Sequence, residues 1–348
     1  MVGKTSLFTI LTGVHQETRI GSTAARMGVA KVPDGRLEAL AKLFEPPKTV
    51  HASVEYIDMP SISKENLRDP SYLASLRVAD AFAHVLRYFQ DESIPHEKGS
   101  VDPIRDLQDV EMELILSDLV VVEKRLERLE KDRKKIKNPE LDREFELLQR
   151  AKAALEENRP LRELQIESED EKRIRGFQFL SLKPVLYVLN LGEGDALVLH
   201  GREREFREEV LKGRHNTAAA AVCGKIEAEL AELPHEEQKD YLASYNLSES
   251  GLERLIEATY SLLGLMSFLT AGEDECRAWT IPMHSSAVKA AGAIHSDFEK
   301  KFIRAEVVNW KSLVDLGGYA GVREKGLLRL EGKEYIVKDG DVLVIRHS

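Results

Sequence analysis

The spacing of hydrophobic residues divides the chain into three regions. Up to residue 102, short helix-like and strand-like segments alternate. Residues 6–13 fit a helix ended by Gly13, residues 51–60 fit a strand that leaves the core at its proline, and residues 81–89 fit a buried parallel strand. The first region therefore has an α/β pattern.

The second region, residues 103–175, has the periodicity of long helices. Apolar residues follow a coiled-coil spacing that is broken at Asn138-Pro139, resumes, and stops at Pro160. We expect an antiparallel helical hairpin, whose seam is formed by Ile115, Leu119, Val122, Leu126, Leu129, Ile136, Leu141, Phe145, Leu148 and Leu155. The charged stretch 124–135 would be its solvated tip or, alternatively, a contact to an acidic partner such as ribosomal RNA.

The third region returns to strands and short helices. Residues 183–191 predict a buried strand, and 217–223 a weaker strand followed by a helix over 225–233. The last 80 or so residues predict a small mixed sheet, with strands at 276–283 and 305–310, a helix over 287–302, and a β-hairpin that turns at 338–341.

Composition narrows the class of protein. The chain has 348 residues, of which 43% are hydrophobic and 32% charged, with a net charge of −10. This charge argues against a general nucleic-acid coat, and we expect no DNA specificity. Two cysteines, Cys223 and Cys276, give neither a disulfide framework nor a metal-ligand pattern. We expect a cytoplasmic protein, because the chain has neither a signal-peptide pattern nor a membrane-length apolar run.

The amino terminus carries a fragment of a phosphate-binding motif. Gly3, Lys4 and Thr5 match the last three positions of G-x-x-x-x-G-K-[ST], and Ser6 follows them in the candidate phosphate site. Lys4 would neutralise phosphate charge, and Thr5 would be a ligand of Mg²⁺ together with Asp58. The first half of the motif is absent from the chain, so an ordinary helix start is the alternative reading.

Further motif fragments stand at predicted strand ends. The segment after Asp58 resembles the D-x-x-G motif of GTPases, with Ser61 at the glycine position. The segment 190–193 corresponds to N-K-x-D, in which Leu191 replaces lysine and Glu193 replaces aspartate. About 32 residues later, Cys223 and Gly224 stand where GTPases place a base-contacting loop. We therefore include Asn190, Leu191, Glu193, Cys223 and Gly224 in the candidate nucleotide site, although each fragment alone could be a plain strand end.

Long blocks of the sequence resemble the YchF family, the Obg-like ATPases of the P-loop GTPase class. The similarity is greatest at residues 275–310 and 332–342, and it extends to residues 32–46, 177–190 and 223–237.

The resemblance implies a fold, an activity and partners. The fold would be a Ras-like α/β G domain (1–102 and 176–265), an inserted helical hairpin (103–175) and a ubiquitin-like TGS domain (266–348); this sequence departs from that fold in lacking the first strand of the G domain. The activity would be slow, Mg²⁺-dependent hydrolysis of ATP in preference to GTP, since the family carries N-x-x-E. His96 would take the place of the usual water-orienting glutamine. A ribosome-associated monomer is the expected form.

The chain also departs from the family pattern at the phosphate-sensing positions. The first switch segment has lost its usual pattern, so that Thr23 is only a nearby hydroxyl, and Gly21 stands where some members have a cysteine. Two functions therefore remain open. One is a slow ATPase. The other is a degenerate, non-hydrolysing adaptor that binds the ribosome or RNA through the hairpin and TGS domain, with local contacts around Lys300, Lys301 and Arg304.

Overall fold

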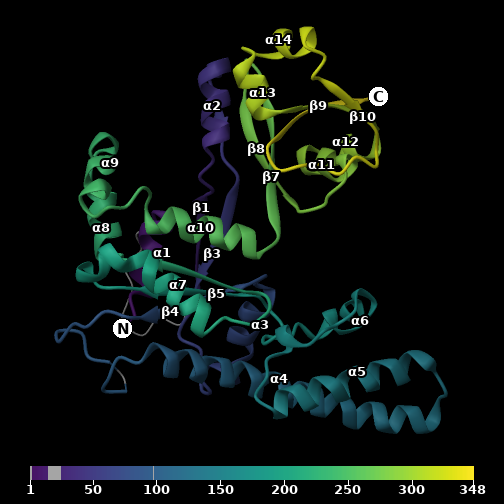
Figure 1. The fold of residues 1–348 in the computed structure, drawn as a ribbon. Helices are drawn as coiled ribbons and strands as arrows, with labels where there is room; N and C mark the ends of the chain where they lie inside the picture. The colour runs from purple at the N-terminus through teal and green to yellow at the C-terminus, as the bar shows by residue number, and fades with distance from the viewer. Residues whose placement is uncertain (1, 15–24, 97) are drawn as a thin grey trace. The chain divides into compact units, whose positions relative to one another are not determined.

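The computed structural model describes residues 2–14, 25–96 and 98–348. The predictions made for Gly21 and Thr23 fall outside these ranges. The chain forms two compact units, which are described separately: one contains Met1–Gly28 and Ile57–Ala258, and the other contains Val29–Tyr56 and Thr259–Ser348 (Figure 1).

The first unit is built on a three-stranded parallel sheet with the order β4-β5-β6. Its strands are β4 (Phe82–Arg87), β5 (Val185–Asn190) and β6 (Thr217–Val222), and all three confirm strands predicted from the sequence. Every residue of β5 is buried, as expected for the central strand of a covered parallel sheet. The carboxyl ends of β5 and β6 lie side by side, with Asn190 opposite Val222.

Helices surround this sheet and fix its loops. The first is α1 (Lys4–Thr12), which ends at Gly13 in the left-handed conformation, as predicted. It packs against α8 (Gly224–Glu232), which follows β6 directly. Apart from the two long helices described below, the unit also contains all or most of α3 (Pro70–Val78), α6 (Ser168–Ile174), α7 (Leu199–Glu209), α9 (His235–Ser244) and α10 (Gly251–Leu262).

Two long helices pack against each other and extend beyond the sheet (Figure 1). They are α4 (Pro103–Lys135) and α5 (Pro139–Glu156), and the α5 amino terminus is capped by the side chain of Asn138. The Arg125 guanidinium on α4 donates two hydrogen bonds of 2.8 Å to the carboxylate of Glu144 on α5. They join the facing sides of the two helices, which run in opposite directions. Apolar side chains from both helices form one buried cluster.

One predicted seam residue is wrong. Ile136 is 61% exposed and lies after the end of α4. The reason is that Asn138-Pro139 starts a new helix. The chain therefore leaves α4 at Ile136, two residues before Asn138, to form the turn between the helices.

Two strands pass from one unit to the other. They are β1 (Arg26–Lys31) and β3 (Ser53–Asp58), which pair as a two-stranded sheet. Strand β3 confirms the predicted strand at 51–60 and places Asp58 at its carboxyl end, with an exposed fraction of 8%.

The second unit contains a six-stranded mixed sheet with the order β10-β9-β11-β7-β8-β2. Strand β11 is central, antiparallel to β9 and parallel to β7. The strands are β2 (Thr49–Val50), β7 (Leu265–Ala271), β8 (Cys276–Pro282), β9 (Phe302–Asn309), β10 (Arg329–Glu331) and β11 (Asp341–His347). The helices are α2 (Gly35–Phe44), α11 (Ala287–Ile294), α12 (Ser296–Lys300), α13 (Trp310–Asp315) and α14 (Tyr319–Glu324).

Two predicted elements of this unit are wrong. The β-hairpin turning at 338–341 is absent, since Asp341 accepts hydrogen bonds from the Lys338 N–H at 2.9 Å and from the Tyr335 hydroxyl at 2.7 Å. These bonds close the preceding segment into a loop, and β11 pairs with β9 and β7 instead. The helix expected over 287–302 is divided into α11 and α12, because His295 has an extended backbone.

The grouping into units also differs from the predicted domain boundaries. Residues 29–56 group with the carboxyl-terminal sheet, since α2 packs against β7, β8 and α13. The domain assignment itself stays a prediction. In the described part of the chain, no helix combines the length and apolarity needed to cross a membrane.

A buried carboxylate anchors α4 to the segment before β5. Asp118 is 2% exposed and accepts hydrogen bonds from the backbone N–H groups of Leu180, at 2.9 Å, and Ser181, at 2.7 Å. Burial raises the pKa of Asp118 to about 6, although these hydrogen bonds oppose the shift.

We expect Asp118→Asn to lower the free energy of unfolding by about 2 kcal/mol at pH 4.5, where the native carboxyl group is mostly protonated and no buried charge is removed by the substitution. An amide offers one acceptor oxygen to two backbone donors, so one buried N–H loses its partner. Urea denaturation followed by circular dichroism measures the loss. Glu127→Gln, at an exposed position on the same helix, is the matched control, and equal midpoints for the two variants would rule out the anchoring role.

The pKa of Asp118 also predicts a pH dependence. The carboxyl group binds its proton more tightly in the folded protein, with a pKa of about 6 against an ordinary value of 3.8. Its contribution to stability therefore falls as the pH rises from about 4 to 6 and is constant above that range. Asp118→Asn should lack this component in denaturation curves recorded across the same window.

Candidate functional site

The amino-terminal fragment Gly3-Lys4-Thr5 opens α1, as the motif predicts. Gly3 precedes the helix with a φ of 87°, a backbone conformation that favours glycine. A Cβ atom at this position would lie 2.4 Å from Nδ2 of Asn190. Glycine is therefore required here both by the backbone angle and by the close approach of β5.

Asp58 is the centre of a cluster of charged and hydroxyl groups at the start of α1. The Nζ atom of Lys4 lies 3.1 Å from Oδ1, although Oδ1 accepts no well-aligned hydrogen bond from it. The Thr5 hydroxyl donates to Oδ2 at 3.1 Å, and Arg26 forms a close ion pair with the same oxygen. Both oxygens of the carboxylate are thus engaged by the protein.

The charge state of Asp58 follows from these neighbours. Burial by itself would raise the pKa of Asp58, but the positive charge of Lys4, its close contact with the carboxylate, and hydrogen bonds from Arg26 and Thr5 outweigh it and hold the pKa below its ordinary value. Asp58 is therefore a carboxylate at neutral pH, and with Lys4 and Arg26 the cluster carries a net charge of +1.

Asn190 joins this cluster to the loop after β6. The residue is buried, with an exposed fraction of 4%. The amide nitrogen donates to the backbone carbonyl of Val2 at 3.0 Å, and the amide oxygen accepts from the Gly224 N–H at 3.0 Å. The structure therefore brings Gly3, Asn190 and Gly224 together, although they are far apart in the sequence.

Glu193 lies in the loop after β5 and is held by two partners. It forms an ion pair with Lys225 and accepts a hydrogen bond from the Tyr245 hydroxyl at 3.2 Å. The hydrogen bond from Lys225 is the main cause of a lowered pKa, and Tyr245 adds to it. Glu193 is therefore an ionised hydrogen-bond acceptor that lies beside Lys225, the residue after Gly224.

Other predicted site residues have surroundings that differ from the prediction. Leu191 is 3% exposed and Cys223 is 1% exposed, and both pack in the core beside the sheet. Their side chains thus belong to the core in this conformation, and their place in the nucleotide site stays a prediction. Burial also raises the pKa of the Cys223 thiol. Ser6 is exposed on the first turn of α1.

His96 is held by the start of α4. Its Nε2 atom lies 2.9 Å from a carboxylate oxygen of Asp106, and its Nδ1 atom accepts the Lys98 N–H at 3.2 Å. Both ring nitrogens are thus engaged in this conformation, and to orient a water molecule the ring would have to give up one partner. A catalytic role for His96 stays a prediction.

Thr5 and Asp58 are the residue types that hold Mg²⁺ in phosphate-loop proteins. The arrangement here does not fit directly bound Mg²⁺, because Arg26 occupies the oxygen that Thr5 also contacts. An ion bound directly to this oxygen would lie next to the positive charge of the guanidinium, which would repel it. Among the described residues, no three His, Cys, Asp or Glu side chains form a metal-binding group.

Arg26 and Tyr245 are site residues that the sequence reasoning missed. Arg26 stands in a segment whose family pattern is lost, so no motif indicated it. Tyr245 is 52 residues from its partner Glu193 and no spacing rule connects them. Both residues can be recognised as part of the candidate site only once the fold is known.

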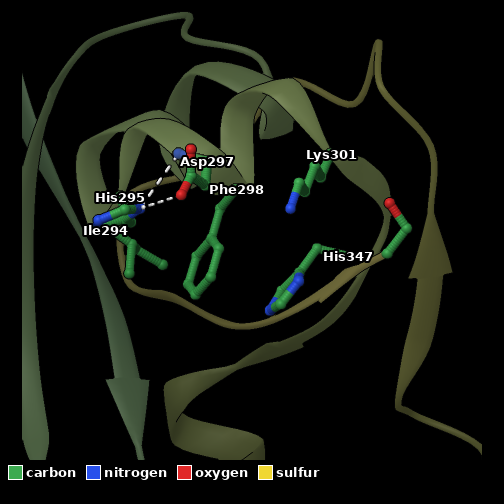
Figure 2. Close-up of a pocket in the computed structure, with 7 residues that line it drawn as sticks. Ile294, His295, Asp297, Phe298, Lys301 and His347 are labelled. Atoms are coloured by element: carbon green, nitrogen blue, oxygen red, sulfur yellow. Dashed lines mark hydrogen bonds and ion pairs between the residues drawn. The ribbon is translucent and has the colours of Figure 1, made fainter.

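A separate pocket lies in the second unit (Figure 2). It has a volume of about 480 Å³ and is lined by Ile294, His295, Asp297, Phe298, Lys301, His347 and Ser348. The Phe298 and His347 rings stack with their centroids 4.3 Å apart. Lys301 was one of three residues predicted for an RNA contact, and that role stays a prediction.

We expect Gly3→Ala to destabilise the protein by about 2 kcal/mol, since the new Cβ combines an unfavourable φ with a clash against Asn190. Gly13→Ala is the matched control, because Gly13 has a φ of 68° but open space around it. Thermal unfolding measures both variants, and a loss for Gly3→Ala no larger than for Gly13→Ala would contradict the role of the Asn190 contact.

Comparison with known proteins identifies relatives along the whole chain. The chain is 41% identical over 355 residues to a protein named "Ribosome-binding ATPase YchF" from Bacillus subtilis, covering 100% of the chain and 96% of that protein. It is 37% identical over 356 residues to the protein of the same name from Haemophilus ducreyi, with the same coverage.

Two further comparisons agree with this result. A family model named YchF-GTPase_C, described as "Protein of unknown function (DUF933)", matches residues 265–348. The solved structure of the Schizosaccharomyces pombe YchF GTPase superimposes with a TM-score of 0.84 and 28% identity, covering 99% of this chain and 94% of that one. The chain belongs to the YchF family.

Proposed function

We propose that the first unit binds ATP between the α1 amino terminus and the loops after β5 and β6, hydrolyses it slowly, and couples its nucleotide state to ribosome association in the cytoplasm. The observation that carries this proposal is the cluster of Lys4, Thr5 and Asp58 beside Asn190. The relatives named "Ribosome-binding ATPase YchF" support both the nucleotide and the partner.

Different groups of the chain would bind the phosphates and the base of the nucleotide. Lys4 would neutralise the terminal phosphates, and the backbone N–H groups in the first turn of α1 would donate to them. Asn190 would hold the phosphate and base loops at a fixed distance. Glu193, ionised and beside Lys225, would accept a hydrogen bond from the exocyclic amino group of adenine.

Family membership also supports the finer assignments. Residues 1–102 and 176–265 would form the G domain, residues 103–175 the helical hairpin, and residues 266–348 the TGS domain. The resemblance implies Mg²⁺ as the metal that neutralises the phosphates when bound, but the contact between Arg26 and Asp58 disagrees with a directly bound ion.

A second function, nucleotide binding without hydrolysis, is favoured by one observation. Both ring nitrogens of His96 are engaged by Asp106 and Lys98, which leaves the proposed water-orienting group occupied. Release of inorganic phosphate, measured beside binding, separates the two functions: binding without release supports an adaptor, and release supports the ATPase.

We expect Lys4→Ala to weaken ATP binding by about 10- to 100-fold, because one charge-assisted contact to phosphate is lost. Isothermal titration calorimetry measures the change, and Lys212→Ala, at an exposed lysine of the same unit, is the control. No binding heat in the wild-type protein under any condition, or equal affinity in Lys4→Ala, would remove the phosphate site.

Glu193→Asp should shift the ratio of ATP to GTP affinity toward GTP by about tenfold, since aspartate is the residue that accepts the guanine N–H groups in the N-K-x-D motif. Competition binding with the two nucleotides measures the ratio. Glu205→Asp on α7 serves as control, and an unchanged ratio in Glu193→Asp would exclude Glu193 from base recognition.

A further inference from the structure

Arg26 stands where a metal ion would otherwise balance the Asp58 carboxylate. We propose that Arg26 supplies the positive charge that Mg²⁺ supplies in other phosphate-loop proteins, so that this site binds a nucleoside triphosphate without a divalent metal. The inference rests on the proposed nucleotide site, and it concerns the cation that accompanies the phosphates.

The fold holds Arg26 in this position from two sides. Arg26 is the first residue of β1, whose partner strand β3 ends at Asp58. Its Cζ atom also lies 5.6 Å from the centroid of the Phe8 ring, on the helix that begins with Lys4. The side chain of Arg26 is only 13% exposed. The guanidinium is therefore placed by packing as well as by charge.

The donors of Arg26 suit a phosphate. A guanidinium has five N–H groups in a rigid fork, and one terminal nitrogen of Arg26 pairs with Asp58. The other N–H groups are of the type that binds phosphate oxygens in pairs. Lys4 lies on the other oxygen of the same carboxylate, so two cations meet at the α1 amino terminus, where an anion is already favoured.

Charge balance distinguishes this arrangement from a metal site. Lys4, Arg26 and Asp58 together carry +1, which attracts a polyphosphate. Among the described residues of the cluster, Asp58 is the only carboxylate, so adding Mg²⁺ directly to it would bring a third cation next to Lys4 and the Arg26 guanidinium. Free ATP should therefore bind at least as well as Mg-ATP.

The test compares ATP binding in EDTA and in excess MgCl₂ by isothermal titration calorimetry. The wild-type protein should show dissociation constants within about threefold of each other in the two buffers. Arg26→Ala should lose about 10- to 100-fold in EDTA and regain most of that affinity with Mg²⁺, since Asp58 and Thr5 become free to accept the ion. Arg26→Lys should lie between them, because lysine keeps the charge but not the fork.

Arg202→Ala, at an exposed arginine on α7, is the matched control and should behave as wild type in both buffers. Circular dichroism establishes that each variant is folded, and Arg26→Lys carries the test if Arg26→Ala is not. Wild-type binding that requires Mg²⁺, with Arg26→Ala unchanged or tighter, would overturn the role of Arg26 while leaving the nucleotide site intact. No ATP binding in either buffer would overturn the proposed function itself.

Discussion

The candidate site depends on one buried amide. Asn190 is the last residue of β5, and its side chain hydrogen-bonds on one side to the backbone of Val2 and on the other to the backbone of Gly224. Leaving the donor or the acceptor of a buried amide without a partner costs free energy, so the side chain favours the one position in which it contacts both Val2 and Gly224. Through them the start of α1 and the start of α8 keep a constant separation, and a ligand spanning the two would find its phosphate and base contacts already arranged.

The sequence predicted those elements whose signals are local. The continuous apolar run of β5 indicated a buried parallel strand, Gly13 indicated the end of α1, and Asn138-Pro139 indicated a helix start. In each case the chemistry of neighbouring residues restricts the backbone directly, through burial on both faces, the left-handed conformation of glycine, or the fixed φ of proline.

The errors came from contacts between residues that the sequence does not place together. The alternating pattern around residues 333–347 suits a hairpin equally well, but Asp341 is 2% exposed and closes a loop onto Lys338 and Tyr335. The motif positions of Leu191 and Cys223 likewise did not indicate that their side chains pack in the core, although their assignment to the nucleotide site stays a prediction. Arg26 shows the same limit most clearly, since its contact with Asp58 follows from β1 pairing with β3 rather than from any motif.

The Asp118 anchor has a mechanical consequence. It ties α4 to the segment just before β5, the strand that ends in Asn190, so the long helix is attached to the sheet that carries the candidate site. The helix continues for 17 residues from Asp118 to Lys135, a lever about 26 Å long at 1.5 Å per residue. If α4 tilted by about 5° around Asp118, its far end at Lys135 would move by roughly 2 Å. A small rotation near the sheet would therefore produce a larger displacement at the tip of the helix.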